Sequence, residues 1–240
     1  MYKRVRLNEV TLVCVAGVEI RKALRALILS AIRVRFKSVK LITPKLPKIN
    51  IGKFHIEKPI DSNLDSMQAY NNYIIYQLSE HIKTKYCLVI QADGYVIKGK
   101  KWQSNFLEYD YIGAPWPLTP NKYIDPFGNA QRVGNGGFSL RSKKLLEVPR
   151  KQKIIWDVNH GDFYKHFGQK SSSEDGIICV HNRHRYLSEG CIFAPLDVAI
   201  AFSRELPIDE IHDPETFGFH RYKPKFIRKK IKKYLNYLNL

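Results

Sequence analysis

Residues 86–91, YCLVIQ, form an almost uninterrupted apolar run. A strand with one face in water alternates apolar and polar side chains, whereas a continuous apolar run is typical of a strand covered on both faces. The run is far shorter than the roughly 18 apolar residues that a membrane-spanning helix needs, and so is every other run in the chain. We therefore expect residues 86–91 to be a central strand between two layers of helices.

Strand and helix patterns alternate before this run. Residues 10–16, 39–43 and 55–58 have strand character, and residues 20–36 and 66–82 carry apolar side chains at helical spacing. This alternation predicts an α/β domain with a mostly parallel central sheet. Ligands of such sheets bind beyond the carboxyl ends of the strands, which places the segment 91–94 at a binding crevice.

The second half of the chain has a different character. Beyond Pro115 it is rich in loops, glycines and aromatic residues, which predicts a mixed region folded against the first sheet. Residues 221–240 hold eight Lys or Arg and no acidic residue, and their apolar side chains fall on one helical face. We expect a domain over residues 1–222 and a basic amphipathic helix over 223–240, which either binds an anionic membrane surface or packs its apolar stripe on the domain. The residues expected to contact the membrane are Lys225, Arg228, Lys229 and Lys232.

The net charge of +18 requires anionic partners, which include nucleotide phosphates, nucleic acid and acidic lipids. The four cysteines show no CxxC spacing, so we expect buried reduced thiols rather than a zinc site. Basic residues precede the apolar segment 10–18 as they do in a signal peptide, but Glu9 and Glu19 bracket it and its composition favours a strand. We expect a protein of the cytoplasm, either free there or peripheral at the inner face of the cell membrane.

Two segments near the central strand could bind a ligand. Asp93 and Gly94 follow the strand, and a carboxylate there suits Mg²⁺ or Mn²⁺ while glycine lets a phosphate approach the backbone; a plain turn is the alternative. The segment 102–116, WQSNFLEYDYIGAPW, is rich in aromatic rings. Sugars bind flat aromatic faces, so Trp116 is a candidate platform, and core packing is its alternative.

Two further segments carry candidate polar groups. Asn135, Gly136 and Gly137 run into a strand-like segment, where a bare backbone would let a ligand approach; a simple glycine turn explains them equally well. Glu174 and Asp175 follow three serines, so they either begin a helix or place a carboxylate that takes a proton from a hydroxyl group.

The order of these segments resembles a known family. The strings QADGYV, FLEYDYIGAPW, VGNGGFSLRS, EDGIIC and FGFH are similar to those of a poorly characterised bacterial family counted among the GT-A-like glycosyltransferases, over residues 8–222. The resemblance implies a single GT-A-like, Rossmann-like domain. It implies that Asp93 and His220 hold the metal, that Glu174 or Asp175 is the catalytic base of an inverting enzyme, and that Asn135, Gly136 and Gly137 border the donor sugar and the acceptor. Together with these three, we expect Gln91, Gly94 and Trp116 to contact the donor or acceptor.

One residue departs from the family pattern. Gln91 stands where the family's DxD motif has its first acid, and an amide can bind ribose or sugar but cannot neutralise a metal. Arg132 and Arg141, beside the glycines, are candidates for offsetting charge on a leaving diphosphate.

We therefore expect an enzyme that moves a sugar from a nucleoside-diphosphate sugar to a glycan or lipid-linked acceptor in cell-surface polysaccharide synthesis, with Mn²⁺ or Mg²⁺. Two alternatives remain. One is a non-catalytic GT-A-shaped partner in polysaccharide assembly at the membrane, which Gln91 favours. The other is a nucleic-acid-binding protein, which the charge permits but no RRM, KH or helix-turn-helix signature supports, so we expect no nucleic-acid partner.

Overall fold

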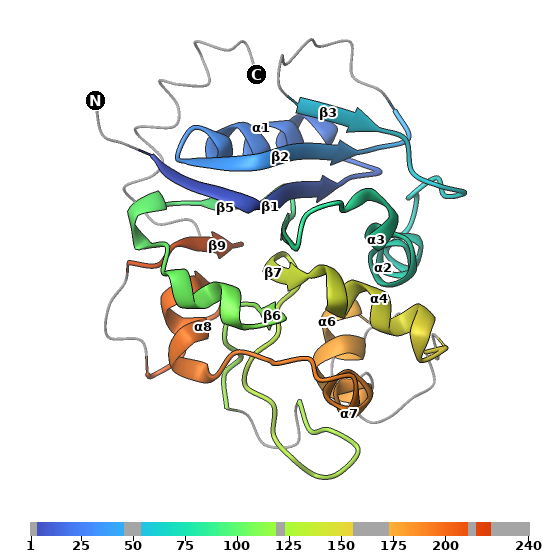
Figure 1. Cartoon of the computed structure of the whole chain (residues 1–240), viewed down its shortest axis with the longest axis vertical. Helices are drawn as coiled ribbons and strands as arrows, with labels where there is room; N and C mark the ends of the chain where they lie inside the picture. Colours follow the sequence, from blue (N-terminus) through green and yellow to red (C-terminus); the bar gives the residue numbers. More distant parts are fainter. Residues whose placement is uncertain (1–3, 46–53, 119–122, 156–172, 211–214, 222–240) are drawn as a thin grey trace.

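The protein is described from a computed structural model, for residues 4–45, 54–118, 123–155, 173–210 and 215–221 (Figure 1). Its main feature is a six-stranded sheet with the order β3-β2-β1-β4-β7-β6. These strands are β1 (Val5–Val15), β2 (Val34–Ile42), β3 (Phe54–Glu57), β4 (Tyr86–Ile90), β6 (Tyr111–Ile112) and β7 (Phe138–Ser142).

The central position predicted for the apolar run is confirmed. β4 pairs in parallel with β1 and antiparallel with β7, and all five of its residues are buried. β1, β2 and β3 are also parallel to one another, so the carboxyl ends of four strands lie at one edge of the sheet. The fold is therefore mixed α/β with a mostly parallel central sheet, as expected.

Helices cover both faces of this sheet, since neighbouring residues of β1 enter different cores. Leu12 and Cys14 pack in one cluster with residues of α1 (Ile20–Ala31). Val13 and Val15 pack in another with residues of α2 (Met67–Tyr76), α3 (Leu78–His81) and α4 (Lys143–Lys151). The four cysteines are free and buried, as predicted.

Two helix boundaries were predicted wrongly. The pattern over residues 20–36 was read as one helix, but α1 ends at Ala31 and β2 begins at Val34. Val34 and Phe36 are buried while Arg35 and Lys37 are exposed, which is the two-residue period of a strand. The helix predicted over 66–82 is divided at Gln77 into α2 and α3, and the Ser66 side chain caps α2 by accepting the Ala69 N–H at 3.1 Å.

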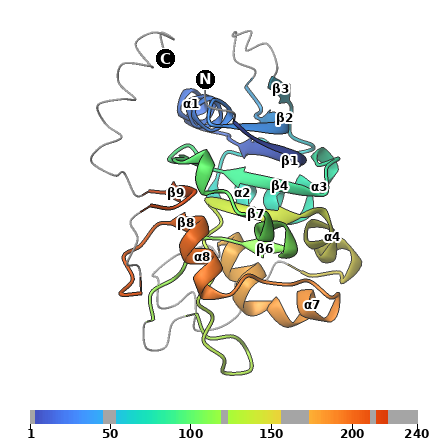
Figure 2. The ribbon, with the colours of Figure 1, turned by 60° about the vertical axis from the view of Figure 1, so that its left-hand side comes forward.

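A second, three-stranded sheet lies beside the first (Figure 2). Its order is β5-β9-β8, formed by β5 (Gly94–Val96), β9 (Gly218–His220) and β8 (Ser203–Arg204), and α8 (Leu196–Phe202) leads directly into β8. β5 and β9 are antiparallel, with Gly94 opposite His220. The second sheet therefore brings the end of the domain to the carboxyl end of β4.

The remaining helices are α6 (Glu174–Gly176), continued by a π-helical turn over Ile177–His181, and α7 (Arg183–Ser188). Within the described parts of the chain, none of the helices is long and apolar enough to cross a membrane.

Ser30 joins α1 to the second sheet. Its buried hydroxyl donates to the Ala26 carbonyl at 2.9 Å and accepts the Val96 N–H at 3.1 Å. Ser30→Ala leaves a buried backbone N–H without a partner, so we expect a loss of about 1–3 kcal/mol in the free energy of unfolding, measured by urea denaturation. Ser188→Ala removes an exposed hydroxyl bond to Arg185 and should change stability by less than about 0.5 kcal/mol. Equal losses in the two variants would contradict this role of Ser30.

Candidate functional site

The candidate site begins at the carboxyl end of β4. The Gln91 N–H donates to the Gly137 carbonyl at 2.9 Å, and its side-chain amide donates to the Tyr70 hydroxyl at 3.0 Å. Asp93 lies in the turn between β4 and β5, and its carbonyl accepts the Arg221 N–H at 3.2 Å. Gln91 and Asp93 therefore have different surroundings. The Gln91 side chain hydrogen-bonds to α2, and the Asp93 carbonyl hydrogen-bonds to the residue that follows β9.

Asp93, His220 and Glu205 form a chain of close polar contacts. His220 Nε2 lies 3.1 Å from Asp93 Oδ1, and His220 Nδ1 lies 3.0 Å from Glu205 Oε2. The imidazole and Glu205 side chains are only 5–6% exposed, whereas that of Asp93 is 43% exposed. Neither contact has the angles of a hydrogen bond, so both ring nitrogens and Glu205 Oε2 are buried without a hydrogen-bond partner among the described residues.

The carboxylates of Asp93 and Glu205 shift the pKa of the His220 imidazole. Burial lowers the pKa of His220, but Asp93 and Glu205 together raise it by more, so that it reaches about 9. Contact with His220 in turn lowers the pKa of Asp93, more than burial raises it. The contacts with Asp93 and Glu205 therefore favour the protonated form of the His220 imidazole.

Asp93 and His220 fit two adjacent ligand positions of a divalent cation site. Two ligands at adjacent corners of an octahedral Mg²⁺, each about 2.1 Å from the ion, lie about 3 Å apart, and Asp93 Oδ1 and His220 Nε2 are 3.1 Å apart. Glu205 at the other ring nitrogen would select the tautomer with a free Nε2, as carboxylates do behind many metal-bound histidines. No group of three or more His, Cys, Asp or Glu side chains suited to a metal occurs among the described residues.

The two glycines of the glycine segment (residues 135–137) allow close packing on both sides. A Cβ on Gly137 would lie 2.2 Å from His220 Cε1, and a Cβ on Gly136 would lie 1.8 Å from Glu174 Oε1. Asn135 has a φ of 61° and is 7% exposed, and its buried Nδ2 has no hydrogen-bond partner among the residues that the structure describes. The glycine segment therefore separates the Asp93–His220 pair from the acids of α6 by a layer of bare backbone.

Glu174 is part of a buried ion pair. Arg141 Nη2 lies 3.1 Å from Glu174 Oε1, and the two side chains are 0% and 5% exposed. Arg141 also donates through Nε to the Ser139 hydroxyl at 2.9 Å and lies over the Tyr111 ring at 5.4 Å. Burial raises the pKa of Glu174, Asp175 raises it further, and Arg141 opposes both. The buried arginine is committed to Glu174, which corrects the suggestion that it offsets charge on a leaving diphosphate.

Arg132, the other candidate for that task, also has partners. Its Nη2 donates to Glu210 Oε1 at 2.8 Å, and its Nε donates to the Trp116 carbonyl at 3.0 Å. Its guanidinium thus already pairs with a carboxylate.

Asp175 is the more accessible acid of the pair. It is half-buried, its Oδ2 accepts the Gly136 N–H at 3.1 Å, and its Oδ1 accepts the Gly176 N–H at 2.8 Å. Both bonds fix the carboxylate against the backbone and leave lone pairs for a further donor. Asp175 is therefore more accessible to a ligand than Glu174.

Trp116 does not offer an open aromatic face. It is 3% exposed, and its ring is stacked on Tyr123 at 4.3 Å with an interplanar angle of 9°. A Cβ on Gly134 would lie 1.9 Å from the indole, so the ring also packs against backbone. The prediction of an exposed sugar platform is corrected: this aromatic block forms core.

The other predicted site residues lie around the glycine segment. Gly94 is held between two backbones, since a Cβ there would lie 2.9 Å from the Phe219 carbonyl and 3.0 Å from that of Gly137.

Glu205 was not predicted, because a single acid after the two-residue strand β8 belongs to no motif. The basic residues Lys225, Arg228, Lys229 and Lys232 lie outside the described residues.

The chain is thus a mixed α/β protein with a polar site at the carboxyl ends of its parallel strands. Residues 53–220 match the family described as a protein of unknown function (DUF5672), and the chain belongs to that family. A comparison with curated proteins finds no match.

Two of the solved structures that match the chain are the following. The bifunctional IspDF from Campylobacter jejuni is 12% identical with a TM-score of 0.41, and the match covers 78% of this chain and 48% of that chain. The galactosyltransferase LgtC, in complex with donor and acceptor sugar analogs, is 12% identical with a TM-score of 0.48, and the match covers 89% of this chain and 87% of that chain. Both similarities are too low to assign an activity.

The buried ion pair gives a stability prediction. Arg141→Met and Glu174→Met each leave one buried charged group without its partner, so each should lower the free energy of unfolding by about 3–5 kcal/mol in urea denaturation. Arg141→Met combined with Glu174→Met removes both charges and should cost less than the sum of the single losses. The exposed Arg150–Glu80 pair is the control, since its removal should cost at most about 1 kcal/mol. Additive losses at Arg141 and Glu174 would show that the pair is not coupled.

Proposed function

We propose that the protein transfers a sugar from a nucleoside-diphosphate sugar to a hydroxyl group of a glycan or lipid-linked acceptor. The observation that supports this most is the arrangement around the glycine segment, with Asp93 and His220 on one side and Asp175 on the other. A transferase needs a place to neutralise a leaving diphosphate and a base for the attacking hydroxyl, and these two groups meet both needs. They also lie where ligands of parallel sheets bind.

Asp93 and His220 would hold Mn²⁺ or Mg²⁺, which supplies positive charge to the leaving diphosphate. Glu205 would keep His220 oriented with Nε2 toward Asp93. The bare backbone at Gly136 and Gly137 admits a bulky donor close to both groups. Asn135 Nδ2, which has no hydrogen-bond partner in the described part of the chain, would donate to a sugar or phosphate oxygen.

Asp175 would take the proton from the attacking hydroxyl of the acceptor. Its carboxylate is positioned by the Gly136 and Gly176 N–H groups, so it does not need to reorganise as the proton moves. Glu174 would act on this base indirectly, because its ion pair with Arg141 fixes the start of α6 below the glycine segment.

Hydrolysis of nucleotide sugars is the direct test of the proposed function. The full chain is screened with uridine, guanosine and thymidine donors, with and without Mn²⁺, and release of the nucleoside diphosphate from at least one donor is expected. Absence of turnover with every donor would instead favour the non-catalytic assembly partner, to which Gln91 in place of an acid points.

A substitution separates the base from its neighbour. Asp175→Asn should lower the turnover of the active donor roughly 10²–10⁴-fold, because the proton acceptor is lost, while the melting temperature changes little. Asp197→Asn, at an exposed acid in the first turn of α8, is the matched control and should keep full turnover. Full activity of the Asp175→Asn variant would rule out this base.

The proposed role of Glu205 is tested by metal binding. In the presence of a nucleoside diphosphate, Glu205→Gln should weaken Mn²⁺ binding by about 10–100-fold, since an amide holds the imidazole less firmly than a carboxylate. Asp93→Asn should weaken it at least as much. Glu210→Gln, at an acid that pairs with Arg132, is the control. Unchanged Mn²⁺ affinity in the Glu205→Gln variant would remove this residue from the site.

We also propose a pathway and a location for the protein. The reaction would belong to cell-surface polysaccharide synthesis, and the protein would lie in the cytoplasm, peripheral at the inner face of the cell membrane. The basic segment 223–240 would contact anionic lipids, since each basic residue near such a surface contributes about 1 kcal/mol. No nucleic-acid partner is proposed.

A further inference from the structure

Arg221 follows β9 directly and lies beside the Asp93–His220 pair. Its backbone N–H donates to the Asp93 carbonyl at 3.2 Å, and its Nη1 lies 3.8 Å from Glu205 Oε1. The pKa of Asp93 is lowered mainly by His220 and to a smaller extent by the charge of Arg221. The Arg221 side chain is 67% exposed, so its guanidinium lies near both acids and remains open to water.

The backbone of Arg221 has an uncommon conformation. Its φ is 56°, in the left-handed region, where a residue with a Cβ is strained. Such strain persists where the surrounding structure fixes it, and it is concentrated at active sites and ligand-binding sites. Asn135, in the glycine segment of the same site, also has a positive φ. The hydrogen bond to the Asp93 carbonyl therefore holds Arg221 at the site in a conformation that an unconstrained arginine would avoid.

Arg221 has hydrogen-bond donors available to a ligand. Arg141 is buried against Glu174, and Arg132 already pairs with a carboxylate. The contact of Arg221 with Glu205, at 3.8 Å, is too long for a hydrogen bond. Within the described residues the Arg221 side chain donates no hydrogen bond, so its five N–H groups can meet an anion.

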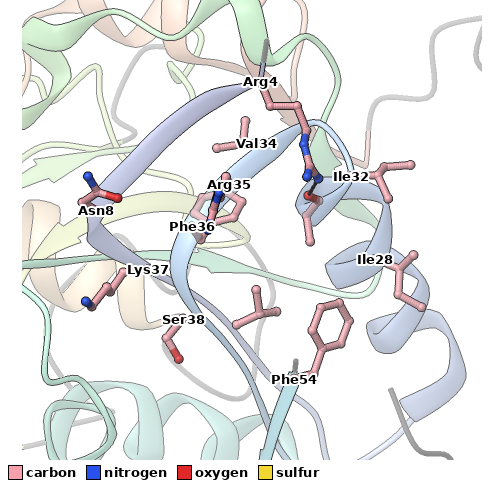
Figure 3. A pocket seen from close by; sticks show the side chains of 12 residues that line it. Arg4, Asn8, Ile28, Ile32, Val34, Arg35, Phe36, Lys37, Ser38 and Phe54 are labelled. Atoms are coloured by element: carbon pink, nitrogen blue, oxygen red, sulfur yellow. Dashed lines mark hydrogen bonds between the residues drawn. The ribbon is translucent and has the colours of Figure 1, made fainter. Parts of the chain in front are cut away.

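The basic residues near the start of β2 belong to a different part of the molecule. Arg35 and Lys37 lie beside a hollow of about 670 Å³ at the first residues of this strand (Figure 3). They alternate with buried residues, so their side chains leave the strand on the face opposite α1. Asp93, in contrast, follows the carboxyl end of β4. These cations therefore lie at the opposite end of the sheet and do not act on a ligand bound beside Asp93.

The charges around Asp93 suit a diphosphate. Gln91 brings no negative charge, where an acid would repel a phosphate group, and Arg221 adds a positive one. A guanidinium also matches two phosphate oxygens with a fork of parallel N–H donors. A divalent cation at Asp93 and His220 would therefore not be the only positive charge beside a bound diphosphate.

We propose that Arg221 binds the phosphate chain of the donor's nucleoside diphosphate, so that this part of the ligand binds even without a divalent cation. The guanidinium pairs with phosphate oxygens, and the strained backbone keeps it next to Asp93. Arg221 is a binding residue and takes no proton. The inference rests on the proposed sugar transfer for the identity of the ligand, but its test does not depend on turnover.

The test measures binding of inorganic pyrophosphate to the full chain by isothermal titration calorimetry, in EDTA and at physiological ionic strength. Arg221→Gln should weaken this binding roughly 10–100-fold, because a charged, forked donor is lost. Glutamine also has a Cβ, so the backbone at position 221 is strained in both proteins. Arg150→Gln is the matched control: it removes the same charge from a side chain that is 72% exposed on α4, and should change the affinity little.

A second measurement distinguishes a phosphate contact from a structural role. The tightest-binding of uridine, guanosine and thymidine diphosphates is titrated with and without Mn²⁺. Addition of Mn²⁺ should strengthen binding to the Arg221→Gln variant more than binding to the unchanged protein, because the ion then offsets charge that the arginine no longer does. Arg221→Lys keeps the charge without the fork, and should lie between the two.

Three results would overturn the proposal: no binding of pyrophosphate to the unchanged protein in EDTA, equal affinity of the Arg221→Gln and Arg150→Gln variants, or an equal gain from Mn²⁺ with and without Arg221. Circular dichroism of each variant confirms that it is folded. Hydrolysis of nucleotide sugars is scored separately. Absence of turnover together with Arg221-dependent binding would count against sugar transfer alone, and turnover together with Arg221-independent binding would count against this inference alone.

Discussion

Two adjacent glycines let three layers of the site approach one another. The His220 ring packs against Gly137, the Glu174 carboxylate packs against Gly136, and the Gly136 N–H holds Asp175. A single methyl group at either glycine would overlap its neighbour, at 2.2 Å from the imidazole or 1.8 Å from the carboxylate. The distance between the imidazole and the acids is therefore set by the thickness of a bare peptide chain, and the local structure on both sides follows from it.

The buried Arg141–Glu174 pair supports this layer from below. An ion pair so far from water contributes little net stability, because desolvation of both groups offsets their attraction. The pair instead positions neighbouring elements. Arg141 donates to Ser139, to the Gly136 carbonyl and to Glu174, so it holds β7, the glycine segment and α6 in one arrangement. On the other side of the glycine segment, the second sheet also positions a site residue. There Glu205, beside β8, contacts the His220 imidazole of β9.

The features predicted correctly from the sequence are those with a local cause. The buried strand β4 and the parallel strands before it follow from the hydrophobic pattern, whereas the pairing of Asp93 with His220 was implied only by the resemblance to a known family. The end of α1 was missed because Val34 and Phe36 continue its apolar spacing by chance while already alternating as a strand. Trp116 was misplaced because exposure depends on Tyr123 and Gly134, which no pattern in the segment 102–116 reveals.

The pairing of β5 with β9 also has a consequence for the order of folding. Gly94 and His220 are 126 residues apart in sequence (220 − 94), yet they are direct neighbours in the sheet. Closing so long a loop is entropically costly, so this contact forms late, after the central strands have associated. During synthesis, Asp93 emerges long before His220 and Glu205 do. The polar site therefore cannot assemble before β9 has emerged, and a chain that ends before β9 would present the unpaired edge of β5 to other molecules.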